Sequence, residues 1–219
     1  MGELDMSFSQ WEKFTLGAAT FSLDTITTIV GSSSLKLASV LAGQANTLPS
    51  SSSLLPCALT KGALRTLIKT VSLPNNVQVG LYCMANTRNA TQGTSRTSYY
   101  VHFRNTGVST GEVRLLKNSS GIGGASVVMA TFPTMNQPTG STFSLELQWT
   151  VAIDEINGVD LVVRYGSLTN FSDLTDVIHI IDTSSPLTIT QGEGIGANDP
   201  TGISAWDVRY DQTTLLRIL

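Results

Sequence analysis

Hydrophobic and polar residues alternate with a period of two in the segment Thr142–Tyr165. Every odd position from Phe143 to Ile153 is apolar, and the even positions from Ser144 to Thr150 are polar. Such alternation is typical of an extended strand with one buried and one solvated face. The dipeptide Asn157-Gly158 accepts positive φ easily, and apolar residues then alternate again through 159–165. The segment therefore predicts a β-hairpin.

The apolar face of this hairpin needs a second sheet to cover it. Burying six such side chains contributes roughly 1.5–3 kcal/mol each, whereas ordering about two dozen residues costs roughly 1–2 kcal/mol per residue in backbone entropy. The rest of the chain shows no convincing 3.6-residue period, and its patterns predict further strands. These are Thr20–Leu23, Thr25–Val30, Ser34–Val40, Ala63–Val71, Val77–Ala85, Thr97–Asn105, Glu112–Lys117, Val127–Phe132, Asp176–Asp182, Ile203–Tyr210 and Thr214–Leu219.

These strands predict an all-β fold, an antiparallel two-sheet sandwich. We expect residues 1–10 to form an N-terminal arm and residues 11–219 to form a single domain that ends in an apolar strand. Long loops are expected at Gly43–Ser53, Asn86–Arg96 and Gly192–Gly202. The last of these contains a Gly-x-Gly-x-Gly sequence, but no strand–helix alternation surrounds it, so we interpret it as a tight turn and not as a nucleotide-binding loop.

The composition favours a protein that packs against partners. Only 13% of the 219 residues are charged, the net charge is −3, and the mean hydropathy is +0.13. A surface with few charges is poorly protected against association, and no basic field is present to attract nucleic acid. The acidic start Met1–Met6 lacks the apolar core of a secretory signal, and no apolar run approaches the ~18 residues that span a membrane.

Few residues offer catalytic chemistry, so we expect no enzymatic activity. The two histidines, His102 and His179, lie on predicted strands, where a histidine is usually structural. The chain has no Gly-x-Ser-x-Gly nucleophile elbow between a strand and a helix, and no Glu-x-Asp-x-x-Glu spacing of carboxylates on one strand. Cys57 and Cys83 show no metal-binding spacing. We expect them to be reduced and mostly buried, with a disulfide between them as the alternative.

Acidic residues near two turns raise the alternative of a bound calcium ion, although we expect no cofactor. Oxygen ligands on loops suit Ca²⁺, but acids at turns more commonly accept hydrogen bonds from the backbone. The residues concerned are Asp154, Glu155 and Asp160 around the hairpin turn, and Asp173 and Asp176 around a later loop.

The polar sides of several strands carry residue types that suit a glycan site. Aromatic rings can stack on sugars, and planar polar groups can bond their hydroxyls. The alternative is an ordinary solvent-facing sheet or a face covered by a partner protein. The candidate residues for a glycan or partner face are Tyr100, His102, Arg104, Glu146, Gln148 and Arg164.

Several short motifs follow one another over residues 11–210. They include Gly31-Ser-Ser-Ser-Leu-Lys-Leu37, Phe143-Ser-Leu-Glu-Leu-Gln-Trp149, Gly192-Glu-Gly-Ile-Gly196 and Trp206-Asp-Val-Arg-Tyr210. Their order resembles that of the concanavalin A-like, laminin-G-type jelly roll. The resemblance implies two stacked, curved antiparallel sheets with lectin-like or structural roles. It transfers no calcium site, because the family's ligand positions cannot be matched one by one.

A low-charge jelly roll of this kind also looks like the virion proteins of tailed bacteriophages. By this analogy we expect a non-enzymatic structural protein, a head decoration or tail component, that is assembled in the host cytoplasm and binds other virion proteins and its own copies. Its expected contact segments are Met1–Trp11, Gly43–Pro56, Asn86–Arg96 and Thr213–Leu219. The alternative is a lectin-like module that recognises a host surface glycan.

Overall fold

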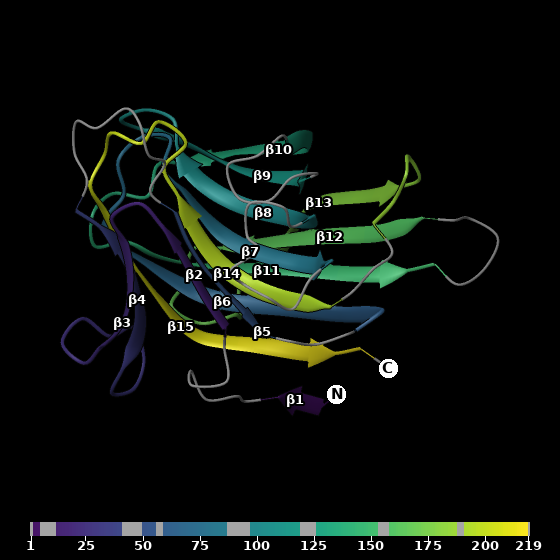
Figure 1. The fold of residues 1–219 in the computed structure, drawn as a ribbon, viewed down its shortest axis with the longest axis horizontal. Coiled ribbons are helices and arrows are strands. Elements are labelled where there is room, and N and C mark those ends of the chain that lie inside the picture. The colour runs from purple at the N-terminus through teal and green to yellow at the C-terminus, as the bar shows by residue number, and fades with distance from the viewer. Residues whose placement is uncertain are drawn as a thin grey trace.

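The computed structural model describes residues 2–4, 12–40, 50–55, 59–86, 97–118, 126–152, 158–187 and 191–218, of which 2–4, 12–14, 16 and 50–55 are described as backbone alone. All regular elements in these ranges are strands, and they form two antiparallel sheets stacked face to face (Figure 1). No helix long and apolar enough to cross a membrane occurs in this part of the chain. The predicted all-β, two-sheet antiparallel sandwich is confirmed.

The first sheet, which we call sheet A, has eight strands. Its strand order is β13 (Thr175–Asp182), β12 (Val159–Gly166), β11 (Thr142–Val151), β6 (Lys61–Ser72), β15 (Trp206–Arg217), β4 (Ser34–Ser39) and β3 (Ala19–Asp24), and β1 (Gly2–Leu4) also pairs with β15. The pairing of β1 with β15 brings the two ends of the chain together, as Figure 1 shows.

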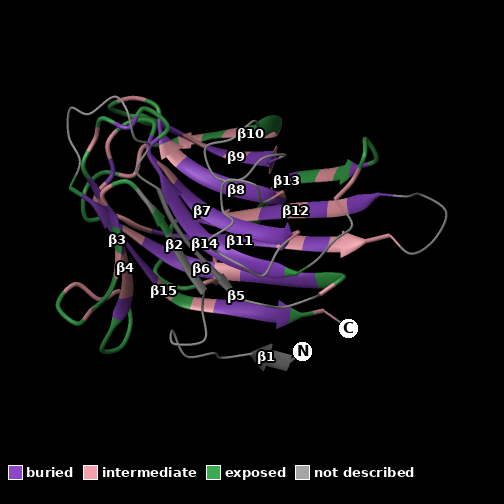
Figure 2. Cartoon of the chain, in the orientation of Figure 1, coloured by how far each residue is buried: buried purple, intermediate pink, exposed green. Residues whose placement is uncertain are grey.

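The second sheet, sheet B, has seven strands. Its strand order is β10 (Ser126–Met135), β9 (Thr110–Asn118), β8 (Ser98–Asn105), β7 (Gln78–Ala85), β14 (Gly192–Asn198), β5 (Ser50–Leu55) and β2 (Glu12–Leu16). Strands β10 and β13 end their sheets on the same side of the sandwich. Figure 2 shows burial concentrated in the central strands, with exposed residues on the edge strands and loops.

The predicted hairpin forms β11 and β12. Leu147 pairs with Val163 and Glu146 with Arg164, so every side chain lies on the face that the alternation predicts. Its inward residues from Phe143 to Trp149 are buried and pack with the inward residues of sheet B in one core. The predicted continuation of this strand to Ile153 and the turn, residues 153–157, lie outside the described part of the chain.

A tyrosine joins the two sheets through the centre of this core. Tyr210 comes from β15 of sheet A, and its hydroxyl donates to the carbonyl oxygen of Gly196 at 2.7 Å in sheet B. The same hydroxyl accepts the backbone N–H of Gly80 at 3.0 Å. A Cβ atom on Gly80 would lie 1.9 Å from the carbonyl oxygen of Val101, so the close approach of β7 and β8 requires glycine here.

The predicted loop Gly192–Gly202 is wrong for its first seven residues, which form the central strand β14. Ile195 and Ala197 point into the core, while glycines 194 and 196 take the outward positions. The sequence pattern did not predict this strand, because its outward positions are glycines and a segment rich in glycine is typical of a turn. The turn itself is confined to residues 199–202, where Asp199 accepts the backbone N–H groups of Thr201, Ile203 and Ser204.

The predicted strand Thr25–Val30 is also wrong, because these residues form a loop. The carboxylate of Asp24 accepts the N–H groups of Ile26 and Thr27, which ends β3. Further along, Asp211 of β15 accepts the N–H groups of Ile29 and Val30. The backbone N–H groups of this segment are thus bonded to the carboxylates of Asp24 and Asp211, so they do not pair with a neighbouring strand.

Three further boundaries differ from the predictions. Strand β2 was not predicted, and β5 starts inside the segment expected as a loop at Gly43–Ser53. The predicted strands Ile203–Tyr210 and Thr214–Leu219 are one strand, β15, interrupted by an irregularity where Gln212 has a φ of 46°. Leu215 on this strand packs in the core. Of the other expected contact segments, Asn86–Arg96 lies outside the described residues except for Asn86, and the side chains of Met1–Trp11 and Gly43–Pro56 lie outside them entirely.

Candidate functional site

The structure divides the six candidate residues between the two outer surfaces of the sandwich. On β8 of sheet B, Tyr99, Val101 and Phe103 point into the core, so Tyr100, His102 and Arg104 point outward. On sheet A, the same alternation turns Glu146 and Gln148 of β11 and Arg164 of β12 outward. Because packed sheets lie about 10 Å apart, the two groups cannot form one site.

The group on sheet A bonds mainly to itself. Glu146 is 3% exposed, and its Oε1 atom accepts Gln148 Nε2 at 2.7 Å and Arg164 Nη1 at 3.1 Å. Arg164 Nε also donates to Asp176 at 2.5 Å, which raises the pKa of Arg164. The buried charge of Glu146 is therefore balanced by neighbouring side chains of the same sheet, and it needs no ligand to balance it.

The group on sheet B belongs to a larger outward surface made by four adjacent strands. We call it face B and define it by two neighbouring rows in register from β14 to β9. The two rows lie two residues apart along each strand, a spacing of about 7 Å. One row is Gly196, Gly80, His102 and Arg114, and the other is Gly194, Tyr82, Tyr100 and Leu116. Face B also includes the outward pair Arg104 and Glu112, two residues further along β8 and β9.

An aromatic pair forms the middle of face B. The rings of Tyr82 and Tyr100 stack with their centroids 4.1 Å apart and an interplanar angle of 10°. Tyr100 also contacts the His102 ring, at 5.2 Å and 52°. Both tyrosines and Leu116 are buried, so in this structure they form a packed support. The expectation that Tyr100 is presented at the surface is therefore wrong.

His102 lies beside this pair as a fully buried imidazole. Neither of its ring nitrogens has a hydrogen-bond partner within the described structure. Burial lowers the pKa of His102 well below its usual value, and the guanidinium groups of Arg104 and Arg114 lower it further. The ring is therefore neutral near pH 7, and its one donor and one acceptor are buried. The expectation that His102 is presented at the surface is therefore also wrong.

Further polar atoms on the outward side of sheet B are buried without a hydrogen-bond partner in the described ranges. They include the hydroxyl oxygens of Ser98 and Tyr100 on β8 and the side-chain carbonyl oxygen of Asn198 on β14. Buried polar groups are nearly always hydrogen-bonded, and each unpaired one costs about 1–3 kcal/mol. Sheet B thus gathers unmet hydrogen-bonding capacity on its outward side.

Charged side chains reach solvent at the β9 end of face B. Glu112 Oε1 lies 2.5 Å from Arg104 Nε and 2.7 Å from Arg114 Nε. The Arg104, Glu112 and Arg114 side chains are 17%, 13% and 26% exposed, so access from solvent is on this side. The residues Tyr82, Glu112, Arg114 and Asn198 were missed from the sequence, although the alternation Glu-Val-Arg in 112–114 places both charged residues on one side.

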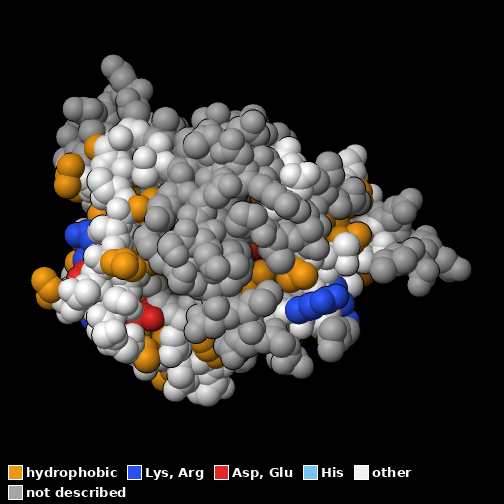
Figure 3. Space-filling view, turned by 60° about the horizontal axis from the view of Figure 1, so that its bottom comes forward, with side chains coloured by type: hydrophobic (Ala, Val, Ile, Leu, Met, Phe, Trp, Pro, Cys, Tyr) orange, Lys and Arg blue, Asp and Glu red, His pale blue; other side chains and the backbone are white. Residues whose placement is uncertain are grey.

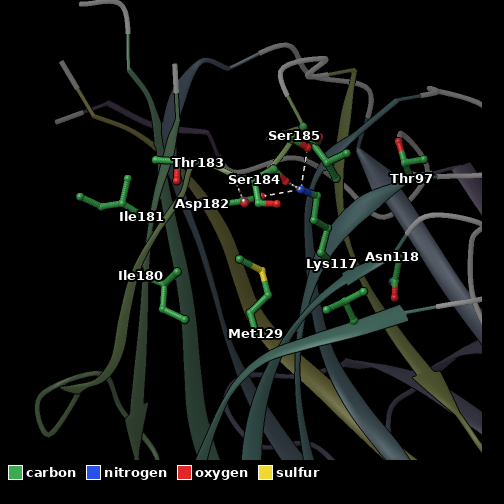
Figure 4. Close-up of a pocket in the computed structure, with 12 residues that line it drawn as sticks. Thr97, Lys117, Asn118, Met129, Ile180, Ile181, Asp182, Thr183, Ser184 and Ser185 are labelled. Atoms are coloured by element: carbon green, nitrogen blue, oxygen red, sulfur yellow. Dashed lines mark hydrogen bonds and ion pairs between the residues drawn. The ribbon is translucent and has the colours of Figure 1, made fainter. Parts of the chain in front are cut away.

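A cavity of about 690 Å³ lies at the edge of the sandwich, between β9 and β10 on one side and β13 on the other (Figure 4). Met129 and Ile180 line it, and Lys117 and Asp182 pair at 2.7 Å. Lys117 Nζ also donates to the carbonyl oxygens of Ser184 and Ser185. Since these polar partners already satisfy the lysine, the cavity offers less for a polar ligand than face B.

The described acids do not assemble a calcium site. Asp160 contacts His179 at 2.8 Å, and Asp173 accepts the backbone N–H groups of Ser167 and Leu168. Asp176 pairs with Arg164. No group of three or more His, Cys, Asp or Glu that could hold a metal occurs among the described residues, which exclude Asp154 and Glu155. Calcium binding stays a prediction without an assigned site.

Cys83 is buried and carries no disulfide, while Cys57 lies outside the described residues. Burial raises the pKa of the Cys83 thiol well above its usual value, and the neighbouring Glu193 raises it further. A protonated thiol is a poor nucleophile.

No protein-family description and no curated protein matches this chain, whereas many solved structures do. An endo-β-1,4-glucuronan lyase from the fungus Trichoderma reesei is 13% identical, with a TM-score of 0.60 and coverage of 99% of this chain and 95% of that one. The carbohydrate-binding module CBM66 from Bacillus subtilis is 14% identical, with a TM-score of 0.59 and coverage of 94% and 95%. The exoplasmic/lumenal domain of VIP36, in a form with Ca²⁺ and mannose, is 9% identical, with a TM-score of 0.58 and coverage of 96% and 84%.

The chain has the concanavalin A-like jelly-roll fold. The lectin-like and carbohydrate-binding-module structures confirm the fold that the motif order predicted. At identities of 8–14% the likeness is one of fold alone and transfers no residue role.

Proposed function

We propose that this protein binds carbohydrate through face B, as a non-catalytic module. The observation that carries the proposal is the partly exposed Arg104–Glu112–Arg114 group, which lies beside the buried, unpartnered imidazole of His102. The polar group on the outer surface of sheet A is taken up by its own contacts. The fold supports the proposal, because the similar structures include a carbohydrate-binding module, a mannose-bound domain and polysaccharide lyases.

Each part of face B has a role in this proposal. The guanidinium and carboxylate groups are planar and present several donors and acceptors to sugar hydroxyls. His102 is fully buried, so it packs next to its register partner Arg114 and does not itself contact the sugar. The stacked Tyr82–Tyr100 pair lies beside His102 and contacts it through Tyr100, so this part of the face is packed before the ligand arrives.

A glycan array followed by calorimetry on variants tests this function. We expect specific binding that weakens in Arg104→Ala and His102→Ala and is unchanged in Gln148→Ala, the matched change on sheet A. A blank array, or loss of binding in Gln148→Ala alone, would contradict the proposal. Oligosaccharide release from the bound polymer would show an enzyme instead of a binding module.

A structural role in a virion, with protein partners and self-association, stays the alternative. One feature favours protein contacts: the edge strand β10 has no charged residue, and Val127, Val128 and Met135 on it are 66%, 46% and 69% exposed. Figure 3 likewise shows few charged side chains among the coloured atoms of the face that it displays. Sedimentation of the purified protein tests this alternative, which predicts oligomers or binding to assembled particles, whereas a monomer that binds no particle contradicts it.

A further inference from the structure

Face B carries an excess of positive charge in a chain whose net charge is −3. Across the outward positions of β14, β7, β8, β9 and β10, the charged residues are Arg104, Glu112 and Arg114. Two arginines and one glutamate give a local charge of +1. Lys117 of β9 points away from this surface, toward Asp182 of sheet A.

The two guanidinium groups have donors to spare. Both contact the same glutamate oxygen through Nε, and Arg104 Nη1 also lies 3.4 Å from Asn76 Oδ1. The remaining terminal nitrogens, Nη2 of Arg104 and both Nη atoms of Arg114, have no hydrogen-bond partner among the described residues. A guanidinium presents its N–H groups as a fork that matches a carboxylate or a sulfate ester in two parallel hydrogen bonds.

The surroundings strengthen such a pair. His102 lies in register with Arg114 and contributes no charge near pH 7, so it neither repels a cation nor neutralises an anion. The buried cluster of Tyr82, Tyr100 and Leu116 lies in the row next to His102 and Arg114, and ion pairs at a poorly solvated surface are stronger than those in bulk water.

We propose that the glycan bound by face B is acidic, with carboxylate or sulfate ester groups that pair with Arg104 and Arg114. This inference rests on the proposed carbohydrate binding and adds the chemical class of the ligand. A carboxylate and a sulfate ester share the chemistry that the arginines recognise, so the experiment has to separate them.

Matched polymer pairs test the class of ligand directly. Calorimetry would compare polygalacturonate with its full methyl ester, which has the same backbone without the charges, and dextran sulfate with dextran. We expect binding to one or both charged polymers and at least tenfold weaker binding to the uncharged partner. Preference for polygalacturonate or for dextran sulfate identifies the anionic group.

Variants of the two arginines locate the effect. Arg104→Gln and Arg114→Gln each leave Glu112 one arginine partner, so both proteins are expected to fold. Each should weaken binding about tenfold to a hundredfold, the equivalent of one lost charge-assisted contact. Arg114→Lys keeps the charge but loses the fork and should fall between. Lys69→Gln on the outer surface of sheet A removes the same charge and should leave binding unchanged.

Three outcomes would overturn this inference. Equal affinity for polygalacturonate and its methyl ester would refute an acidic ligand while leaving carbohydrate binding intact. Equal competition by inorganic polyphosphate at matched charge would show plain ion exchange. Unchanged binding in both arginine variants would place the ligand elsewhere. Absence of binding to every glycan would instead refute the proposed function itself.

Discussion

We expect the buried residue Glu193 to make the stability of this sandwich depend on pH. The residue lies on β14 on the same side as the core residue Ile195, and it is fully buried. Neither carboxylate oxygen has a hydrogen-bond partner among the described residues. Burial without a partner disfavours the ionised form and raises the pKa of Glu193 from 4.5 to about 8. The substitution Glu193→Gln removes this titration while keeping the shape of the side chain.

The direction and size of the effect follow from the two pKa values. Between pH 4.5 and about pH 8 the folded protein holds a proton that the unfolded chain has released. The contribution of Glu193 to stability is therefore full below pH 4.5 and falls as the pH rises, levelling off above about pH 8. A difference of about 3.5 units corresponds to a loss of about 5 kcal/mol as an upper bound.

Urea unfolding followed by fluorescence of the buried Trp149 and Trp206 measures this loss at steps from pH 5 to pH 9. His102 acts in the opposite direction, because its lowered pKa favours the folded state as the pH rises toward 6.5. Asp182, whose pKa is lowered, acts only below about pH 4. The difference between the wild type and Glu193→Gln cancels both terms. We expect the free energy of unfolding of the variant to exceed that of the wild type by an amount that grows up to about pH 8. Parallel curves for the two proteins would contradict the raised pKa of Glu193.

Two further substitutions test the contacts between the sheets. Gly80→Ala places a methyl group against the carbonyl oxygen of Val101, so we expect loss of folding or a large drop in the thermal midpoint. The control Val108→Ala changes an exposed residue and should have no effect. A normal midpoint for Gly80→Ala would contradict the close approach of β7 and β8. Tyr210→Phe leaves the Gly80 N–H and the Gly196 carbonyl unpaired in the core. We expect urea unfolding to show a free energy of unfolding that is lower by about 2–4 kcal/mol. A change below about 0.5 kcal/mol would show that the two hydrogen bonds contribute little.

Much of the fold was predictable because alternation is a local signal. The odd positions of Phe143–Val151 face the core, and β11 pairs antiparallel with β12, as the sequence pattern predicts. The turn residues 153–157 lie outside the described part of the chain. The pattern failed where side chains were missing. In β14 the outward positions are glycines, so the strand looked like a turn although Ile195 and Ala197 alternate as in any other strand.

The candidate site was less predictable, because it depends on which strands become neighbours. Alternation shows correctly that His102 and Glu146 point away from the core, but it does not show that β8 and β11 belong to different sheets. The same limit hid Arg114, whose place beside His102 follows from the pairing of β8 with β9. Of the six candidate residues, the strand pairing places Tyr100, His102 and Arg104 on face B. It also places Glu112 and Arg114 beside them.

Side-chain NMR can show whether the ligand binds at face B, because arginines on the two outer surfaces give separate signals. A glycan selected on the array would be titrated into ¹⁵N-labelled protein while the arginine Nε–H signals are recorded, with assignments from the Arg→Gln variants. The account predicts that the signals of Arg104 and Arg114 shift with the ligand and that the signal of Arg164, on the opposite sheet, stays in place. A shift of Arg164 with Arg104 and Arg114 unchanged would contradict it.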